Sequence, residues 1–162
     1  MAAAAYRIAE VDPLGADALK LLRQAAIEAR ALYPELHVPG SPWPTNAPTP
    51  ARGTYLVAYL ADEPVAMGAH RPIDNQCTEV RRMFVARPAR RCGAGRAILQ
   101  ALEIHAQSQG FDQLLLETGF KQLAAMALYE SYGFVRIPPF GPYATDPTSV
   151  CFSKPVHGSS AA

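Results

Sequence analysis

Cysteine, lysine and tryptophan are scarce in this sequence, whose 162 residues include three cysteines, three lysines and one tryptophan. The cysteines Cys77, Cys92 and Cys151 are odd in number and lack a C-x-x-C spacing, which argues against a disulfide framework. Reduced thiols are typical of a reducing compartment, so we expect a cytoplasmic protein.

Neither sign of charge dominates the chain, and no long apolar run opens it. The 15 Lys and Arg residues nearly balance the 14 Asp and Glu residues, which excludes a global field that would hold the chain on nucleic acid or a membrane surface. Residues 1–5 are followed at once by Tyr6 and Arg7, so this N-terminus lacks the apolar length of a signal peptide or membrane span. We therefore expect no nucleic-acid partner and no membrane partner.

Hydrophobic periodicity divides the chain into elements. It predicts strands at residues 6–11, 54–60, 65–71, 78–85, 114–116 and 149–154, and helices at 13–33, 93–109 and 122–132. Because several strands precede the first strand–helix–strand unit, we predict an α/β chain with a mixed sheet and helices on its faces. We expect one domain over residues 1–157 and a disordered tail over residues 158–162.

A proline-rich loop is expected between the first helix and the second strand. Residues 34–50 contain six prolines, one glycine and the only tryptophan, Trp43. Proline removes backbone donors and blocks regular structure, and a loop this long is more often functional or mobile than idle. Two interpretations stay open, namely a surface excursion anchored by Trp43 and a lid over a substrate.

The segment RRCGAGR at residues 90–96 lies between a predicted strand and a predicted helix. Free N–H groups at a helix N-terminus attract phosphate, and glycine lets its oxygens approach the backbone. A P-loop is excluded because Arg96 and Ala97 stand where Lys and Ser/Thr are required. A dinucleotide fingerprint is closer, with Glu117 near the ribose position, but Ile98 replaces its third small residue. A solvated basic turn is the alternative that these residues alone leave open.

Two motifs together carry a more specific resemblance. Arg90, Gly93 and Gly95 match the pattern Gln/Arg-x-x-Gly-x-Gly/Ala, and residues 122–134 (QLAAMALYESYGF) match Asn-x-x-Ala-x-x-Leu-Tyr-x-x-x-Gly-Phe apart from Gln122. Both patterns belong to the GCN5-related N-acetyltransferase (GNAT) family, which the chain resembles over about residues 54–154. The resemblance implies a GNAT-like fold, in which a mostly antiparallel central sheet has splayed fourth and fifth strands and helices on both faces.

The resemblance also implies acetyl-CoA as co-substrate and no metal. The loop amides would bind the pyrophosphate, and the fourth strand would run beside the pantetheine arm, with Gln122 standing where Asn is usual. The cofactor-binding candidates are Met83, Phe84, Val85, Arg90, Arg91, Cys92, Gly93, Ala94, Gly95, Arg96, Gln122 and Tyr129.

Catalytic roles follow from the same resemblance. Tyr129 occupies the position of the family's frequent general acid, which would protonate the departing thiolate after an amine attacks the thioester. Core packing is the alternative role for this tyrosine. Glu79 precedes Arg90 by eleven positions, the spacing of a strand-borne glutamate base in the histone-acetylating branch. A chain of water molecules could replace it, and Arg81 on the same strand face could make it a salt-bridge partner instead.

The resemblance further implies an acceptor that is a primary amine of a small molecule or peptide, bound by residues 32–50 and 137–143. Arg81, Arg82 and Arg136 suggest an acceptor that also carries a carboxylate or phosphate. The competing function is a non-catalytic acyl-CoA sensor of the same fold. The oligomeric state stays open, with a homodimer among the alternatives.

Neither cysteine nor histidine chemistry is expected in the reaction. Cys92 lies in the phosphate loop, away from the expected acetyl group, so it is a weak nucleophile candidate. The histidines at positions 37, 70, 105 and 157 show no metal-ligand spacing, and we expect surface or core roles for them.

Overall fold

The computed structural model describes residues 6–156 and folds them around one seven-stranded sheet with the order β1-β2-β3-β4-β5-β7-β6. Neighbouring strands are antiparallel except β4 and β5, which are parallel. The strands are β1 (Arg7–Glu10), β2 (Thr54–Leu60), β3 (Glu63–Pro72), β4 (Cys77–Val85), β5 (Gln113–Gly119), β6 (Val135–Ile137) and β7 (Ser149–Pro155). The expected mixed, mostly antiparallel sheet is confirmed.

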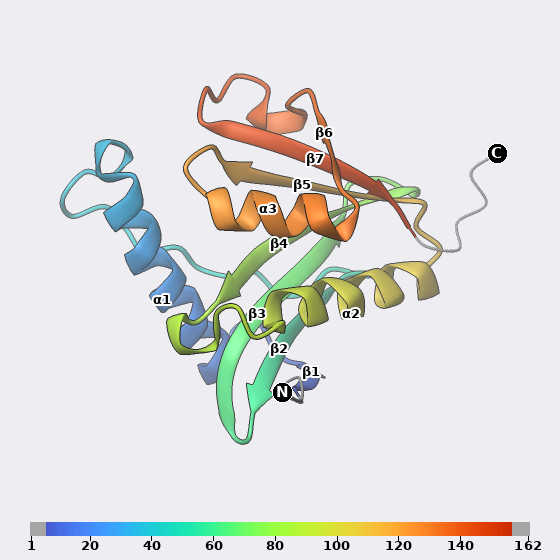
Figure 1. The fold of residues 1–162 in the computed structure, drawn as a ribbon, viewed down its shortest axis with the longest axis horizontal. Helices are drawn as coiled ribbons and strands as arrows, with labels where there is room; N and C mark the ends of the chain where they lie inside the picture. Colours follow the sequence, from blue (N-terminus) through green and yellow to red (C-terminus); the bar gives the residue numbers. More distant parts are fainter. Residues whose placement is uncertain (1–5, 157–162) are drawn as a thin grey trace.

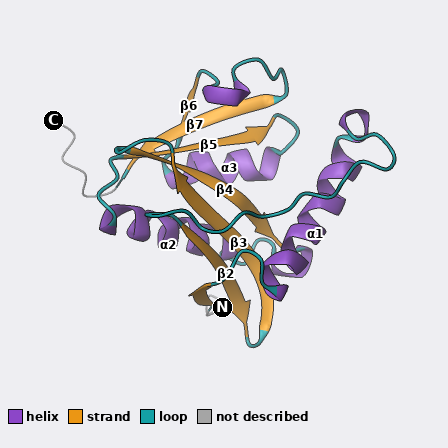
Figure 2. Ribbon diagram, turned by 180° about the vertical axis from the view of Figure 1, so that it is seen from behind, coloured by secondary structure: helices purple, strands orange, loops and turns teal. Residues whose placement is uncertain are grey.

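Three α-helices cover the two faces of this sheet (Figures 1 and 2). They are α1 (Ala16–Leu32), α2 (Ala94–Ser108) and α3 (Leu123–Tyr132). One core cluster joins α1 to one face of the sheet, and a second cluster joins α2 and α3 to the other. Figure 2 shows the long loop after α1 crossing the sheet on the α1 side before it enters β2.

Helical spacing explains which side of each helix is buried. In α1 the buried residues Ala18, Leu21 and Leu22 recur at steps of one turn and pack on β2 and β3. In α2 the fully buried residues Ile98 and Leu102 pack on the opposite face. The helix lies close to β3 because Gly68 has no side chain there: an added Cβ would lie 2.5 Å from Ile98 Cγ2.

Strands β4 and β5 pair over only part of their length. Residues 77–80 of β4 lie opposite residues 113–116 of β5, and no pairing of these two strands continues beyond Val80 and Leu116 in the described chain. In Figure 1 the two strands diverge past this point, and we call the region between their unpaired edges the opening. The predicted splay is therefore confirmed, with its vertex at Val80 and Leu116.

A bulge lies in β4 immediately after the vertex. Met67 lies opposite Phe84 and Ala69 opposite Arg81, so β4 contains one extra residue between these pairs. Arg82 has a φ of 61°, a left-handed conformation that is uncommon for a residue with a side chain. Past the bulge, Met83 and Val85 pack on the α2 and α3 side while Phe84 packs on the α1 side.

Three parts of the fold were not predicted or lie outside the described residues. The short strand β6 was missed, because three residues provide too little alternation to stand out. Short 3-10 helices at Pro34–Leu36, Arg87–Ala89 and Gly141–Tyr143 occupy segments expected to be irregular. The predicted tail over residues 158–162 lies outside the described residues.

Candidate active site

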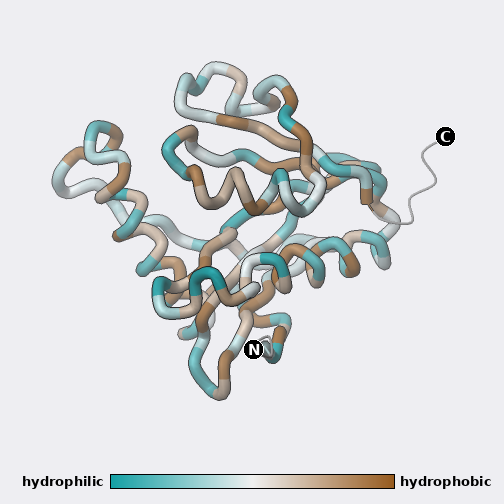
Figure 3. Tube along the Cα trace, in the orientation of Figure 1, coloured by the Kyte–Doolittle hydropathy of each residue, from teal (hydrophilic) through white to brown (hydrophobic). Residues whose placement is uncertain are grey.

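The loop between β4 and α2 presents unpaired backbone donors. Within residues 6–156, the backbone N–H groups of residues 91–96 donate no hydrogen bond. Arg91 and Gly93 have φ values of 62° and 86°, and this left-handed geometry turns the chain sharply into the first turn of α2. The loop is also strongly hydrophilic, as Figure 3 shows. Unpaired N–H groups at a helix start are the geometry that binds anions, so the loop remains the predicted phosphate site.

The two glycines of this loop have different functions. Gly93 supplies the left-handed turn and has open space around it. Gly95 is buried, and a Cβ added there would lie 2.8 Å from Leu128 Cδ2 of α3. Gly95 therefore brings the start of α2 against α3, beside the opening between β4 and β5.

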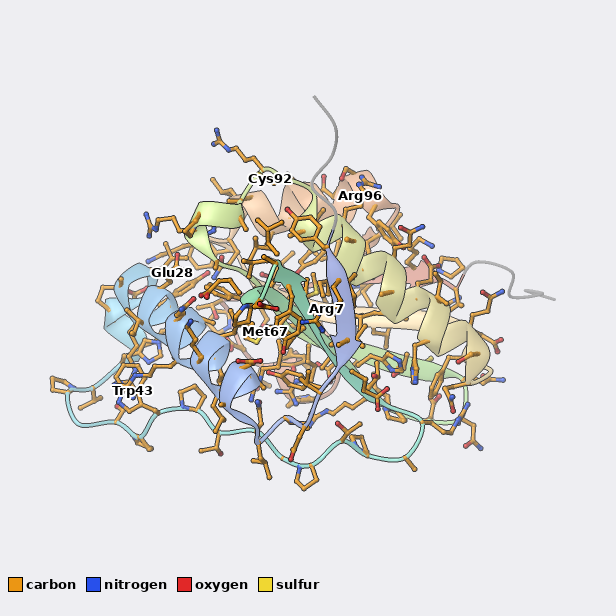
Figure 4. The ribbon with its side chains drawn as sticks, turned by 90° about the horizontal axis from the view of Figure 1, so that it is seen from below. Arg7, Glu28, Trp43, Met67, Cys92 and Arg96 are labelled. Atoms are coloured by element: carbon orange, nitrogen blue, oxygen red, sulfur yellow. The ribbon has the colours of Figure 1, made fainter. Side chains whose placement is uncertain are left out.

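Side chains of the loop are exposed or held by neighbouring elements. Arg91 and Cys92 are exposed, Ala94 is buried, and Arg96 donates to the Ser131 hydroxyl at 3.0 Å. Figure 4 shows Cys92 and Arg96 at the start of α2. The anion site is thus built mainly from backbone, with arginines at its rim.

Arg90 connects the loop to α1. Its guanidinium donates to both carboxylate oxygens of Glu28, at 2.7 and 2.8 Å, and its Nε donates to the Val85 carbonyl at 3.0 Å. Both contacts to Glu28 come from one nitrogen, Nη2, and together with the Nε bond they fix the guanidinium plane. The sequence predicted a residue at the phosphate and did not predict this contact with α1.

The predicted β4 residues border the opening between the splayed strands. Met83, Phe84 and Val85 are half-buried and lie on the part of β4 that has no β5 neighbour. Gln122 is the N-cap residue of α3, across the opening, and its side-chain amide makes no hydrogen bond within the described residues. Unpaired strand edge and free amide together suit an extended polar ligand.

Tyr129 points its phenol ring into the core below this opening. Its side chain is 5% exposed and packs against Phe134 and Phe152 at centroid distances of 5.9 and 6.1 Å. Its hydroxyl makes no hydrogen bond within residues 6–156. Burial raises the pKa of this phenol, and the Glu117 carboxylate raises it further, so the hydroxyl keeps its proton at neutral pH.

Glu79 is buried on the α1 side of the sheet, with 5% of its surface exposed. It accepts a 2.6 Å hydrogen bond from the Tyr143 hydroxyl, and the Arg71 guanidinium of β3 lies 3.7 Å away. The alternative that paired Glu79 with Arg81 is therefore corrected, because cross-strand register places Arg71 directly opposite Glu79.

Glu117 is a second carboxylate that sequence reasoning assigned to no catalytic role. It follows Leu116, so it is the first β5 residue past the vertex. It is half-buried and accepts a 2.6 Å hydrogen bond from Ser149. Burial raises its pKa, and the nearby carboxylates of Asp146 and Glu79 raise it further, although the Ser149 hydrogen bond and the positive charge of Arg81 offset part of this shift. Its position at a strand end was visible in the sequence, but the divergence of β4 and β5 there was not.

Two hollows lie on the α1 side, and Glu79 lines one of them. The first, of about 250 Å³, is lined by the loop residues 46–50 and by Arg71, Arg81 and Arg82. The second, of about 410 Å³, is lined by Glu79 and by residues 140–142, and it shares Pro50 and Arg71 with the first. Arg136 is exposed on β6 and lines neither hollow, because its guanidinium lies over the Phe152 ring.

The proline-rich loop is held along its length. The guanidinium carbons of Arg23 and Arg30 lie 3.4 and 3.6 Å from the centroid of the Trp43 ring, so Trp43 anchors the loop to α1 (Figure 4). Further along, Asn46 donates to the Pro13 carbonyl and accepts from Arg82. The loop is thus both anchored by Trp43 and a wall of the first hollow.

The remaining sequence candidates lie apart from this site. His70 is buried and contacts Thr78 and His105 at 2.7 and 2.9 Å. Within residues 6–156 no three His, Cys, Asp or Glu side chains gather as a metal site would require. Over the same residues no helix is long and apolar enough to cross a membrane.

Comparisons with known proteins agree with this architecture. The model of the acetyltransferase (GNAT) family matches residues 18–134. An IAA acetyltransferase of Azospirillum brasilense is 46% identical over 104 residues, which are 63% of this chain and 67% of that protein. The uncharacterized N-acetyltransferase YsnE of Bacillus subtilis is 34% identical over 103 residues, 62% of this chain and 68% of that protein.

Solved structures share the fold over nearly the whole chain. A putative acyl-CoA N-acyltransferase from Klebsiella pneumoniae has a TM-score of 0.78 and 30% identity, covering 94% of this chain and 99% of that one. A GNAT family acetyltransferase from Elizabethkingia anophelis, solved with acetyl-CoA bound, has a TM-score of 0.65 at 17% identity, covering 93% and 97%, and shows the fold alone. With the family model matching most of its length, this chain belongs to the GNAT family of acetyltransferases.

Proposed function

We propose that the protein transfers the acetyl group of acetyl-CoA to a primary amine of a small molecule or peptide by direct attack in a ternary complex. The observation that supports the proposal is the divergence of β4 and β5, with unpaired loop N–H groups and a protonated phenol on one face of the sheet and two carboxylates on the other. Such an arrangement would let a thioester and an amine meet from opposite faces of the sheet.

The loop and the strand edge fit the cofactor. Six consecutive backbone N–H groups, at residues 91–96, would receive the pyrophosphate oxygens of acetyl-CoA. The unpaired edge of β4 at Met83, Phe84 and Val85 would run beside the pantetheine arm, with the Gln122 amide as a further polar contact. Backbone N–H groups of this edge would polarise the thioester carbonyl.

Tyr129 would donate to the sulfur as the carbon–sulfur bond breaks. A phenol with a raised pKa is protonated throughout the neutral range, so the donor is always available. Because a thiolate is less basic than this phenol, the main contribution is a hydrogen bond that stabilises developing charge. No covalent intermediate on the protein is needed.

A carboxylate on the α1 side would receive the proton of the attacking ammonium. We assign this base role to Glu79, acting directly or through water, with Tyr143 holding its carboxylate in place. Glu117 is the alternative base, because its raised pKa brings it closer to neutrality. The two glutamates lie on the same face of neighbouring strands. Comparing the rates of Glu79→Gln and Glu117→Gln would therefore show which of them is the base.

A thiol-release assay with acetyl-CoA and a panel of amines, amino acids and peptides tests the proposal, together with calorimetric measurement of acetyl-CoA affinity. Release of CoA that depends on the amine supports it. Tight acetyl-CoA binding without turnover on any amine would replace it with the sensor function. Failure to bind acetyl-CoA would reject both.

A further inference from the structure

Three guanidinium groups share the first hollow. Arg71 comes from β3, and Arg81 and Arg82 are consecutive residues of β4 that both reach the hollow because the bulge interrupts strand alternation. Burial and the positive charges of Arg81 and Arg71 lower the pKa of Arg82. Like charges held together in a partly buried space repel one another, so an anion entering the hollow would be stabilised by all three.

Two of the three arginines already have partners. Arg82 donates to the Asn46 side chain at 3.0 Å and to the Thr45 carbonyl at 3.1 Å, which fastens the proline-rich loop to β4. Arg71 lies 3.7 Å from the Glu79 carboxylate. Arg81, in contrast, makes no hydrogen bond or ion pair within the described residues, although it is only half-exposed. Arg81 is therefore the arginine that is available to a ligand.

Arg81 also stands beside the expected reaction centre. It is the first β4 residue past the vertex, just as Glu117 is the first past it on β5. A long guanidinium side chain that starts at the vertex can hold a group only a few bonds away from an attacking nitrogen.

We propose that the acceptor is a small amine that carries a carboxylate within a few bonds of its nitrogen, as an amino acid does, and that Arg81 binds this carboxylate. The inference rests on the proposed acetyl transfer and specifies its substrate class. The site is polarised to match, with arginines around the first hollow and the Glu79 carboxylate in the adjoining second hollow, which shares Arg71 and Pro50 with the first. Loop residues such as Pro48 and Pro50 give the first hollow an apolar wall for a short side chain.

The experiment compares matched acceptors with the wild-type chain. Leucine, leucinamide and isopentylamine share the same alkyl chain and amine, but only leucine has the carboxylate. Alanine, alaninamide and ethylamine form a smaller set of the same design. Aminoethyl phosphate is an amine that carries a phosphate in place of a carboxylate. We expect kcat/KM for the better amino acid to exceed that for its amide and amine by about 30-fold or more, the effect of one hydrogen-bonded ion pair. Equal rates for acid and amide, or a preference for the phosphate, would overturn the proposal.

Two substitutions assign the effect to Arg81. Arg81→Gln should raise KM for the amino acid about 30-fold and leave the slow reaction of the amine without a carboxylate unchanged. Arg81→Lys should restore part of the loss. Arg136→Gln removes an exposed arginine outside both hollows and is the matched control. An equal loss on acceptors with and without a carboxylate would refute the role of Arg81.

Calorimetry with acetyl-CoA separates this inference from the function beneath it. If acetyl-CoA binds and amides react as fast as acids, only the substrate class is wrong. If acetyl-CoA does not bind, the proposed function is wrong and the substrate class falls with it.

Discussion

Replacing Tyr129 by phenylalanine removes one oxygen from the protein and little else. The ring would keep its contacts with Phe134 and Phe152, and the lost hydroxyl has no hydrogen-bond partner within the described residues. The free energy of unfolding should therefore change by less than about 0.5 kcal/mol. Acetyl-CoA affinity should stay within about a factor of two, because the pyrophosphate site lies on the α2 loop.

Turnover should fall far more than affinity. A positioned proton donor typically contributes about 10² to 10⁴ in rate, so kcat for Tyr129→Phe should drop by at least about 100-fold, or about 2.7 kcal/mol of activation free energy. Single-turnover thiol release with saturating acetyl-CoA and amine measures the chemical step, and calorimetry measures the dissociation constant of acetyl-CoA.

Tyr132→Phe is the matched control, because Tyr132 lies one turn away on the same helix. Its hydroxyl donates to Glu103 at 2.7 Å, so its loss should cost about 1.5 kcal/mol of stability and leave kcat unchanged. An unchanged single-turnover rate in Tyr129→Phe would remove the phenol from the mechanism. A fall in both variants would show that α3 packing, and not the hydroxyl, controls the rate.

Three further predictions concern the base, a buried histidine and a close helix contact. If Glu117 is the base, kcat/KM should decline at acidic pH with a midpoint above the ordinary glutamate pKa of 4.5, and Glu117→Gln should abolish this decline. If the decline disappears only in Glu79→Gln, Glu79 is the base. Burial, and then His105, lower the pKa of His70 from 6.5 to about 4. As pH falls from 6.5 to about 4, the imidazole is therefore protonated in the unfolded chain before it is protonated in the folded one, and the free energy of unfolding decreases by about 3 kcal/mol. Urea denaturation should show that His70→Gln flattens this decline, and an equal decline in both proteins would contradict the assignment. Gly68→Ala should lower the free energy of unfolding by about 1–3 kcal/mol, because Ile98, Met83 and Leu102 crowd the added Cβ; a melting temperature equal to that of the wild type would show that α2 can move away without cost.

Local patterns in the sequence determined most of the elements. The repeat of Ala18, Leu21 and Leu22 in α1, the glycine at the start of α2 and the alternation in β2 and β3 are properties of neighbouring residues, and each predicted its element to within a few positions. The cofactor loop could be located for the same reason, since its glycines and its helix are contiguous. Strand β6 escaped because three residues cannot display a period.

Contacts between distant residues could not be read from those patterns. Arg71 pairs with Glu79 because of the register of β3 and β4, which the turn between these two strands sets. Tyr143 reaches Glu79 from a loop 64 residues further along the chain. Glu117 acquires its raised pKa only where the fold buries it next to other carboxylates. The acceptor side therefore depends on tertiary arrangement, whereas the loop for the cofactor depends on local sequence.

The bulge in β4 makes the length of this strand a constraint in its own right. A strand presents alternate residues to opposite faces, and the extra residue between Arg81 and Phe84 reverses that alternation midway. Deleting Arg82 would restore regular alternation and leave Met83, Phe84 and Val85 on their present faces, but Asn46 and Thr45 would lose their contact with β4. Among homologous sequences aligned to this segment, a one-residue deletion here should consequently be accompanied by changes in the proline-rich loop.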